Sequence, residues 1–230
     1  MHIIFLAIII SILAFFVYAS ANIRSGVYLH VFCRKKTKEK IIALTFDDGP
    51  DQIQTPKVLD VLRERQIPAC FFCIGNKIKG NEKLLRQIID EGHCIGNHSF
   101  SHSVCFPLYG YRRMQRDLTA CQQELERVTG MPVQWFRPPF GVTNPTLAQT
   151  IHRLEYTTIG WNIRTLDTLQ PASEKIIRRI KKRLAPGSIL LLHDHIANSD
   201  QLLIQILNLL AKEGYTVVSL DTLLQETPAG

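Results

Sequence analysis

Short apolar runs alternate with longer amphipathic segments from residue 41 almost to the end of the chain. Several of these runs are continuously apolar, a pattern typical of parallel strands that are covered on both faces. The pattern predicts seven strands: Ile41–Phe46, Ala69–Ile74, His93–Gly96, Gln134–Arg137, Tyr156–Trp161, Ser188–Leu192 and Thr216–Ser219. It also predicts six helices: Lys57–Gln66, Glu82–Glu91, Tyr111–Thr129, Pro145–Arg153, Glu174–Leu184 and Asp200–Glu213.

Polar residues with short side chains mark the starts of several predicted helices. Asn81, Ser173 and Ser199 are expected to cap three of them, and Thr143 or Asn144 is expected to open another. Strands that alternate with helices predict an α/β domain, either a βα barrel or a doubly wound open sheet. In both architectures, catalytic side chains lie at the carboxyl ends of the strands.

The N-terminus is a separate apolar segment. Ile3–Ala19 contains one polar residue, Ser11, and its length is at the lower limit for a membrane span. Residues 19–21 resemble a signal-peptidase site, but no lysine or arginine precedes the apolar run, so we favour an uncleaved anchor over a cleaved signal. We therefore expect a membrane anchor or signal segment over residues 1–22, a basic linker over 23–40 and one α/β domain over 41–225.

Composition and charge narrow the class of protein. The chain has 230 residues, 46% of them hydrophobic and 20% charged, values that exclude a disordered chain and fit a single domain. Part of the net charge of +7 comes from basic clusters at 34–40 and 178–183, which we expect to be solvated surfaces. Neither cluster has the pattern of a nucleic-acid-binding module, so no nucleic-acid partner is expected. Cys70 and Cys73 lie three apart in a predicted strand and therefore point to opposite faces, which favours packing over a redox pair.

Acidic and basic side chains collect where the predicted strands end. Asp47 and Asp48 follow the first strand and point in different directions, so one carboxylate can bind a metal while the other accepts a proton. A turn or helix cap is the alternative for this pair. His98 and His102 would share one helical face and, with a carboxylate, suit a divalent ion; surface or core packing is the alternative. His193 ends a buried strand and suits acid–base chemistry near neutral pH.

Other polar positions are expected to support this rim. Arg137 precedes two prolines that stiffen its loop, where we expect a salt bridge. Asp194 and His195 are expected to fix the loop that follows the sixth strand, and His93 to pack or to support the site. Three further histidines have no comparable context and are treated as incidental: His2, His30 and His152.

Four motifs together resemble the polysaccharide deacetylases, that is, carbohydrate esterase family 4 or the nodulation-protein-B homology domain. They are Thr45-Phe-Asp-Asp-Gly-Pro50, His98-Ser-Phe-Ser-His102, Arg137-Pro-Pro-Phe-Gly141 and Leu191-Leu-His-Asp194. They occur in the family's order and span most of residues 41–224. The resemblance implies a distorted (β/α)7 barrel of the glycoside hydrolase/deacetylase type, and a divalent metal that is Zn²⁺ or, alternatively, Co²⁺ or Mn²⁺.

The resemblance also assigns a role to each matching residue. Asp48, His98 and His102 match the metal ligands of the family. Asp47 matches its catalytic base, and Arg137 matches the residue that steadies this base. These assignments resolve which of the two adjacent carboxylates is expected to bind the ion.

Further roles concern the reacting group. The backbone N–H of Phe140 is implied to complete the oxyanion site, and Leu191 to pack near the acyl methyl group. His193 matches the acid, and Asp167 is implied to orient it. The sequence departs from the family after the fifth strand, where the usual Asp-x-x-Asp-Trp reads Arg164-Thr-Leu-Asp167-Thr168. This departure concerns the substrate groove more than the chemistry.

The activity implied by the resemblance is the hydrolysis of N-acetyl groups from peptidoglycan- or chitin-like amino-sugar polysaccharide, with release of acetate. We expect a monomer anchored through the apolar segment with its catalytic domain on the cell-envelope side, or a secreted protein if that segment is cleaved. Basic residues after the apolar run favour the cytoplasmic side instead. Two alternatives remain: a deacylase or deformylase of a lipid-linked amino sugar, and a non-catalytic carbohydrate-binding relic of the fold.

Overall fold

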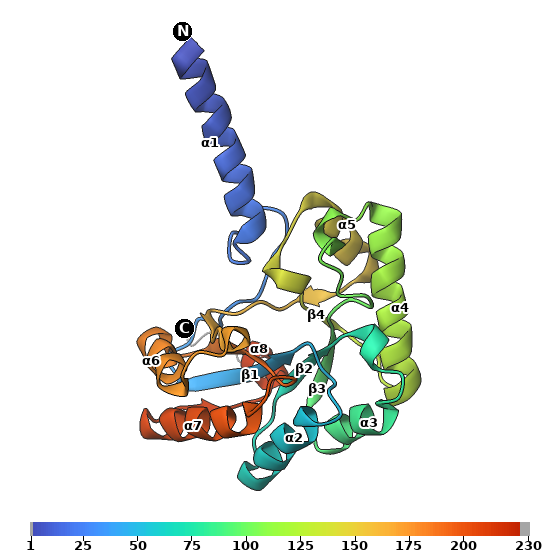
Figure 1. Ribbon diagram of the computed structural model, residues 1–230, viewed down its shortest axis with the longest axis vertical. Coiled ribbons are helices and arrows are strands. Elements are labelled where there is room, and N and C mark those ends of the chain that lie inside the picture. The colour runs from blue at the N-terminus through green and yellow to red at the C-terminus, as the bar shows by residue number, and fades with distance from the viewer. Residues whose placement is uncertain (1, 226–230) are drawn as a thin grey trace.

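A computed structural model describes residues 2–225 (Figure 1). The described residues form one sheet in which every paired strand is parallel to its neighbour. The strand order is β5-β4-β3-β2-β1-β7-β6, and β8 pairs with the beginning of β1. The strands are β1 Ile41–Asp47, β2 Cys70–Cys73, β3 Cys94–Asn97, β4 Trp135–Phe136, β5 Thr157–Thr158, β6 Ile163–Arg164, β7 Ser188–His193 and β8 Thr216–Val217.

Helices connect most successive strands, and those between strands cover the outer face of the sheet, whereas the last helix packs on the inner face (Figure 1). They are α2 Gln54–Arg65, α3 Glu82–Asp90, α4 Tyr111–Thr129, α5 Pro145–Leu154, α6 Ser173–Arg183, α7 Ser199–Lys212 and α8 Leu220–Gln225. Short 3₁₀ turns occupy η1 Gly75–Lys77, η2 Phe106–Leu108, η3 Pro139–Gly141 and η4 Asp167–Leu169. The predicted α/β architecture is therefore confirmed.

The alternation of side chains along β1 separates two cores. Ile42, Leu44 and Phe46 belong to a large cluster between the sheet and its helices. Ile41 and Ala43 belong to a smaller cluster on the other face, where α8 contributes two leucines. Because residues two apart on a strand share a face, Thr45 and Asp47 point to the same inner side as Ile41 and Ala43. The sheet thus curls around a small core and carries polar groups at the carboxyl end of its inner face.

The curled sheet is a half-barrel that stays open between β5 and β6. These two strands form the edges of the sheet and share no ladder within residues 2–225. The segment before β1 runs across this side of the domain. Its Phe32 N–H donates to the Thr158 carbonyl at 2.9 Å, and the Lys35 N–H donates to the Gly187 carbonyl at 2.8 Å. Residues 32–35 are therefore hydrogen-bonded to the domain that follows them in sequence.

Each predicted strand occurs, with different boundaries in some cases. The predicted strand Tyr156–Trp161 is reduced to Thr157–Thr158, and β6 and α8 were not predicted. The predicted cap at Asn144 is confirmed, because its side chain accepts a hydrogen bond from the Leu147 N–H at 2.8 Å. Asn81 is the N-cap residue of α3 as predicted, but its side chain makes no cap hydrogen bond. The other two predicted caps were wrong, because Ser173 and Ser199 are the first helical residues.

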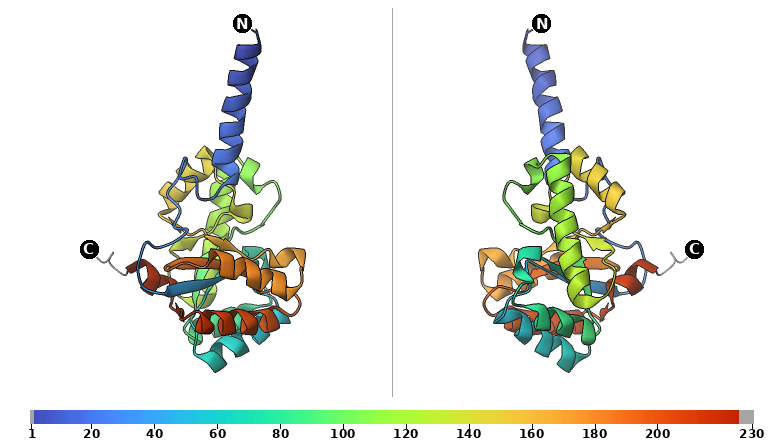
Figure 2. Two further views of the ribbon diagram at one scale, coloured as in Figure 1. Left: turned by 90° about the vertical axis from the view of Figure 1, so that its left-hand side faces the viewer. Right: turned by 90° about the vertical axis from the view of Figure 1, so that its right-hand side faces the viewer.

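The apolar N-terminal segment forms α1, His2–Ala21, which stands out from the body in all three views (Figures 1 and 2). A helix of 20 residues is about 30 Å long, the thickness of a bilayer core. Within the described residues, it is the one helix long and apolar enough to cross a membrane. Its last turn is tied to the domain, because Ala19 is fully buried and the Thr143 N–H donates to the Ser20 carbonyl at 3.0 Å.

The cysteines of β2 pack as predicted. Cys70 belongs to the inner core and Cys73 to the outer one, so their side chains lie on opposite faces of the sheet. Both are fully buried and unpaired among the described residues. Burial raises the pKa of each thiol well above its usual value, which favours the unreactive protonated form.

Candidate active site

Polar side chains from four strands meet at the carboxyl end of the half-barrel. Asp47 ends β1, His98 follows β3, Arg137 follows β4 and His193 ends β7. Asp47 and His193 lie directly opposite each other in the β1–β7 ladder. A pocket of about 210 Å³ opens here, lined by Asp47, Asp48, His98, His102, Pro138, Phe140, Gly141, Trp161, Arg164, Thr168, Leu191 and His193.

Three side chains at this rim form a cluster with the geometry of a metal site. Asp48 Oδ1 lies 3.4 Å from His98 Nε2 and 3.2 Å from His102 Nε2. All three potential ligand atoms lie within 4.8 Å of one another. His98 is oriented by its other ring nitrogen, because Nδ1 lies 2.8 Å from the Arg137 carbonyl oxygen. A ring that donates Nδ1–H to a carbonyl presents a neutral Nε2 for coordination.

The two histidines come together in a loop, so the predicted shared helical face was wrong. Residues 98–102 contain no helix, and Ser99 and His102 have φ values of 67° and 44° in the left-handed region. The His102 N–H donates to Ser99 Oγ at 3.0 Å. Asp117 of α4 accepts the backbone N–H groups of Phe100 and Ser101 at 2.8 and 3.2 Å. These bonds fold the loop back on itself and bring the two rings to a centroid distance of 4.9 Å.

The chemistry of this cluster fits a divalent cation. Asp48 Oδ1 is buried and has no hydrogen-bond donor within the described part of the chain. Burial opposes the charge of this carboxyl, but contact with His98 and the charges of the other histidines hold the pKa of Asp48 below its usual range. Burial lowers the pKa of His102 to about 4, and the nearby His98 adds to this effect. A charged carboxylate and a neutral imidazole are the forms that bind metal ions.

The neighbouring carboxylate, Asp47, forms a buried ion pair with Arg137. Arg137 Nη1 lies 2.7 Å from Asp47 Oδ1 and donates also to Thr45 Oγ1 at 2.8 Å. The rest of the guanidinium donates to two backbone carbonyls after β5, so its position is fixed from three sides. Asp47 Oδ2 is left facing the metal cluster, 3.8 Å from His98 Nε2. One oxygen of Asp47 is therefore anchored while the other remains available for a proton.

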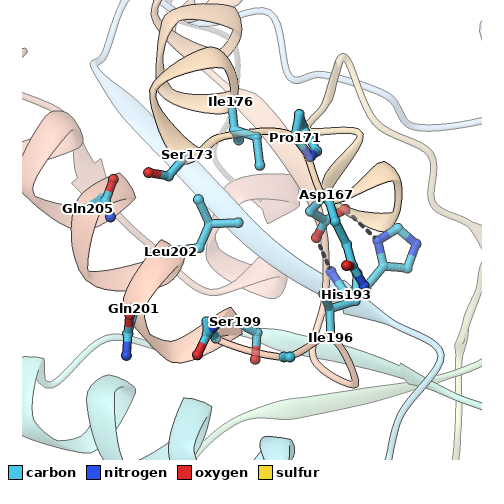
Figure 3. Close-up of a pocket in the computed structure, with 13 residues that line it drawn as sticks. Asp167, Pro171, Ser173, Ile176, His193, Ile196, Ser199, Gln201, Leu202 and Gln205 are labelled. Carbon is cyan, nitrogen blue, oxygen red and sulfur yellow. Dashed lines mark hydrogen bonds and ion pairs between the residues drawn. The ribbon is translucent and has the colours of Figure 1, made fainter.

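His193 and Asp167 form a second pair across the pocket. Asp167 Oδ1 lies 2.8 Å from His193 Nδ1, and Asp167 Oδ2 accepts the His193 backbone N–H at 2.8 Å (Figure 3). Burial lowers the pKa of His193, but the hydrogen bond to Asp167 and its charge outweigh burial and raise the pKa above its usual value. Because Nδ1 is bonded to Asp167, Nε2 is the free nitrogen, and it lies 3.9 Å from Asp48 Oδ2.

Asp167 and His193 also line a second cavity, of about 380 Å³, beside α6 and α7 (Figure 3). The rest of its wall mixes polar side chains, such as Ser173, Gln201 and Gln205, with apolar ones, such as Ile176 and Leu202. Asp167 itself is only 3% exposed, so its carboxylate is committed to His193 rather than to solvent.

Phe140 and Leu191 both line the pocket. Phe140 is in the left-handed region with φ 61°, and its ring centroid is 4.8 Å from that of His102. Leu191 lies on β7 and contributes an apolar wall to the pocket. Two prolines, Pro138 and Pro139, directly precede Phe140 and restrict the backbone of this loop, as the sequence indicated.

The structure adds three supporting residues that sequence reasoning missed. Thr45 shares the inner face of β1 with Asp47, so strand alternation could have found it. Lys77 Nζ donates to the Asp48 carbonyl at 2.6 Å from η1, and no spacing in the sequence indicates this contact. Trp161 lines the pocket, with its ring centroid 5.6 Å from the centre of the Arg137 guanidinium.

Asp194 packs against the turn that follows Asp48. It is fully buried and accepts a hydrogen bond from Thr55 Oγ1 at 2.5 Å. A side chain at Gly49 would collide with the Asp194 carboxylate, so this turn requires glycine. Burial raises the pKa of Asp194 to about 7. The carboxyl therefore packs against the turn after β1 instead of entering the pocket.

Comparison with known proteins identifies the relatives of this chain. Residues 34–159 match the polysaccharide deacetylase family. A peptidoglycan-N-acetylglucosamine deacetylase of Bacillus cereus is 37% identical over 196 residues, covering 81% of this chain and 89% of the relative. A peptidoglycan-N-acetylmuramic acid deacetylase of Bacillus subtilis is 35% identical over 194 residues, covering 83% of this chain and 73% of the relative.

A solved structure agrees with these sequence relatives. It is that of a mutant with restored enzymatic activity, made from a carbohydrate esterase family 4 pseudoenzyme of Bacillus anthracis. It is 26% identical to this chain with a TM-score of 0.80, and the match covers 87% of this chain and 73% of the other. The family match over more than half of the sequence, together with the 37% identity to one relative, shows that the chain belongs to the polysaccharide deacetylase family.

Proposed function

We propose that this protein is a metal-dependent hydrolase that removes N-acetyl groups from amino-sugar polysaccharide and releases acetate. One observation carries the proposal: the cluster of Asp48, His98 and His102 shares a single pocket with Asp47 and His193. Relatives that act on acetylated amino sugars of peptidoglycan support the same substrate class.

Zn²⁺ is the proposed ion, since two imidazoles and one carboxylate form a common catalytic zinc set that leaves a position open; Co²⁺ or Mn²⁺ are alternatives. When bound, such an ion supplies a Lewis acid that polarises the amide carbonyl and acidifies water. The protein supplies the three side chains that hold it, and the carbonyl of Arg137 that orients His98.

Asp47 is proposed as the general base. Its Oδ1 is held by Arg137, so Oδ2 faces the ligand cluster in a fixed direction. There it takes a proton from the attacking water as the new carbon–oxygen bond forms. The backbone N–H of Phe140 is proposed to donate a hydrogen bond to the carbonyl oxygen as negative charge develops on it. Leu191 is proposed to pack against the acyl methyl group.

His193 is proposed as the general acid on the opposite side of the pocket. Its Nε2–H donates a proton to the departing nitrogen as the carbon–nitrogen bond breaks, which leaves acetate and a free amine. Asp167 accepts a hydrogen bond from Nδ1–H of His193 and favours the ring that is protonated on both nitrogens. The raised pKa of His193 keeps a larger share of the acid form near neutral pH.

The test is acetate release by the full chain from peptidoglycan, chito-oligosaccharide and xylan, with and without a chelator. We expect release from an amino-sugar substrate that the chelator abolishes and added Zn²⁺ restores. Xylan carries O-acetyl groups and serves as the comparison for amide specificity. Absence of release from every amino-sugar substrate at full metal occupancy would leave the alternative of a carbohydrate-binding relic.

We also propose that α1 anchors the enzyme and that the catalytic domain faces the cell envelope. The exposed apolar surface of α1 supports the anchor, and relatives that act on peptidoglycan support the side of the membrane.

A further inference from the structure

A second cavity, of about 270 Å³, lies beside the catalytic pocket. Four residues line both spaces: Phe140, Gly141, Trp161 and Arg164. The remaining wall comes from the end of α1 and the residues that follow it, from the residue before β6 and from the end of α6. It consists of Ala21, Asn22, Ile23, Arg24, Asn162 and Arg183. A substrate that occupies the catalytic pocket thus has a neighbouring space that leads towards the base of the membrane helix.

Three arginines give this cavity its charge. Arg24, Arg164 and Arg183 line it, and none of their guanidinium groups has an ion-pair or hydrogen-bond partner among residues 2–225. Arg179 lies behind them and donates to the Arg164 carbonyl at 2.6 Å. Burial lowers the pKa of Arg179, and the positive charges of Arg183 and Arg164 lower it further. Like charges are therefore crowded together here without a compensating carboxylate.

Helix electrostatics do not account for this arrangement. Arg183 ends α6, where a cation interacts favourably with the helix dipole. Arg164 lies on β6 and has no such partner. Arg164 also lies beside the ring of Trp161, with 5.9 Å between the guanidinium centre and the ring centroid. It stands at the position where the sequence departs from the family motif, a feature that the catalytic roles above do not explain.

The chemistry of the cavity matches one class of ligand. Guanidinium groups bind phosphate through paired hydrogen bonds, and three of them around one space favour a group with more charge than a single carboxylate. The position of the cavity adds a second constraint. With α1 across a bilayer, residues 21–24 lie where the helix leaves the membrane, at the level of lipid phosphate groups.

We propose that the arginine-lined cavity binds a phosphate group carried by the amino-sugar substrate, so that the enzyme acts on sugar phosphates presented at the membrane surface. This inference rests on the proposed deacetylase function and narrows its substrate. The acetylated sugar occupies the catalytic pocket, its phosphate lies among Arg24, Arg164 and Arg183, and a lipid chain attached to that phosphate would extend along α1.

The first test compares two substrates of the full chain in detergent micelles: an N-acetylated chito-oligosaccharide and the same oligosaccharide with a phosphate ester at its reducing end. We expect kcat/KM to be about tenfold higher or more for the phosphorylated form, the effect of one charge-assisted contact. Arg24→Gln and Arg183→Gln should bring this ratio close to one, mainly through KM. Lys182→Gln is the matched control, because Lys182 is an exposed cation of α6 outside the cavity, and it should leave the ratio unchanged.

Equal turnover of the two oligosaccharides, or a preference that survives both arginine substitutions, would overturn the proposal. If neither oligosaccharide is hydrolysed, the proposed function fails separately, and calorimetry with N-acetylglucosamine 1-phosphate still decides the subsite. The wild-type chain should bind this compound, whereas Arg24→Gln and Arg183→Gln should bind it at least tenfold more weakly; equal binding by all three would overturn the proposal.

A third experiment distinguishes the phosphate of the substrate from that of a lipid headgroup. The enzyme is placed in nanodiscs of phosphatidylcholine or of phosphatidylglycerol, and the preference for the phosphorylated oligosaccharide is measured in each. We expect the preference in both. Its loss in phosphatidylglycerol alone would assign the cavity to lipid headgroups and overturn the assignment to the substrate.

Discussion

Arg137 Nη1 donates to Asp47 Oδ1 at 2.7 Å, and neither residue is more than 3% exposed. This buried ion pair separates the roles of two carboxylates that are adjacent in sequence. Asp47 is held by the guanidinium of Arg137. The Asp48 carboxylate instead lies next to the rings of His98 and His102, and within residues 2–225 no lysine or arginine forms an ion pair with it. One carboxylate is therefore fixed in place, and the other is free to coordinate an ion.

Replacing Arg137 by Met should strongly destabilise the protein. The substitution leaves the Asp47 carboxylate buried without its partner, a change that costs about 3–5 kcal/mol in other proteins. The free energy of unfolding, measured by denaturant titration of the full chain in detergent, checks this. Arg127→Gln is the control, because Arg127 pairs with Glu124 at the surface and its loss should lower the free energy of unfolding far less. Similar losses in the two variants would contradict the structural importance of the buried pair.

Replacing Asp47 by Asn should separate catalysis from metal binding. The amide keeps the shape of the carboxylate but accepts no proton, so acetate release should fall by about 10²–10⁴-fold. Because Asp47 is not in the ligand cluster, the bound Zn²⁺ measured by atomic absorption should stay near one ion per chain. A variant that retained most of its turnover would show that another group is the base.

Removing a ligand should abolish stabilisation by the metal. An ion that binds only the folded state raises stability by about 2.7 kcal/mol at a free concentration 100 times its Kd. Added Zn²⁺ should therefore raise the thermal midpoint of the wild-type chain but not that of His98→Ala or His102→Ala. His152→Ala is the control, because His152 is exposed on α5 and should leave the shift intact. A full shift in His98→Ala would place the ion elsewhere.

Much of the rim could be predicted because strand ends are readable in the sequence. The buried runs of β1 and β7 end at Asp47 and His193, and parallel pairing of these runs brings the two residues opposite each other. The four motifs then identified the family that the comparisons confirmed. Local hydrophobic pattern and a few polar residues were sufficient for this part of the structure.

The remaining features depend on contacts between distant segments. The loop that joins His98 to His102 takes its shape from hydrogen bonds to Asp117, which lies on α4 and has no signature in the spacing of the histidines. The strand β6 has two residues, Ile163–Arg164, which is too short for any periodicity. Lys77 contacts the Asp48 carbonyl only because η1 packs beside the turn after β1. Such contacts follow from the folded chain and not from local pattern.

Replacing Asp167 by Asn should shift the pH dependence of turnover. The negative charge of Asp167 and its bond to Nδ1 raise the pKa of His193, against the effect of burial, so the variant should have a lower pKa at this ring. The general acid works only when protonated, so activity falls as pH rises through this pKa. The fall on the alkaline side of the kcat/KM profile should therefore move to lower pH in the variant. Asp90→Asn, at an exposed position on α3, should leave the profile in place, and an unshifted profile for Asp167→Asn would contradict the pairing.

Deleting residues 2–17 should release the enzyme from membranes without unfolding it. These residues are exposed in the structure, whereas the last turn of α1 is part of the domain through the buried Ala19 and the hydrogen bond between Thr143 and Ser20, so the shortened chain retains this contact. The full chain should stay in the membrane pellet after alkaline carbonate extraction, and the shortened chain should be soluble and still hydrolyse a soluble chito-oligosaccharide. The intact mass of the membrane-bound protein distinguishes an anchor from a cleaved signal, because cleavage after Ala21 would remove α1. A full-length chain that carbonate extracts completely would show that α1 does not span the bilayer.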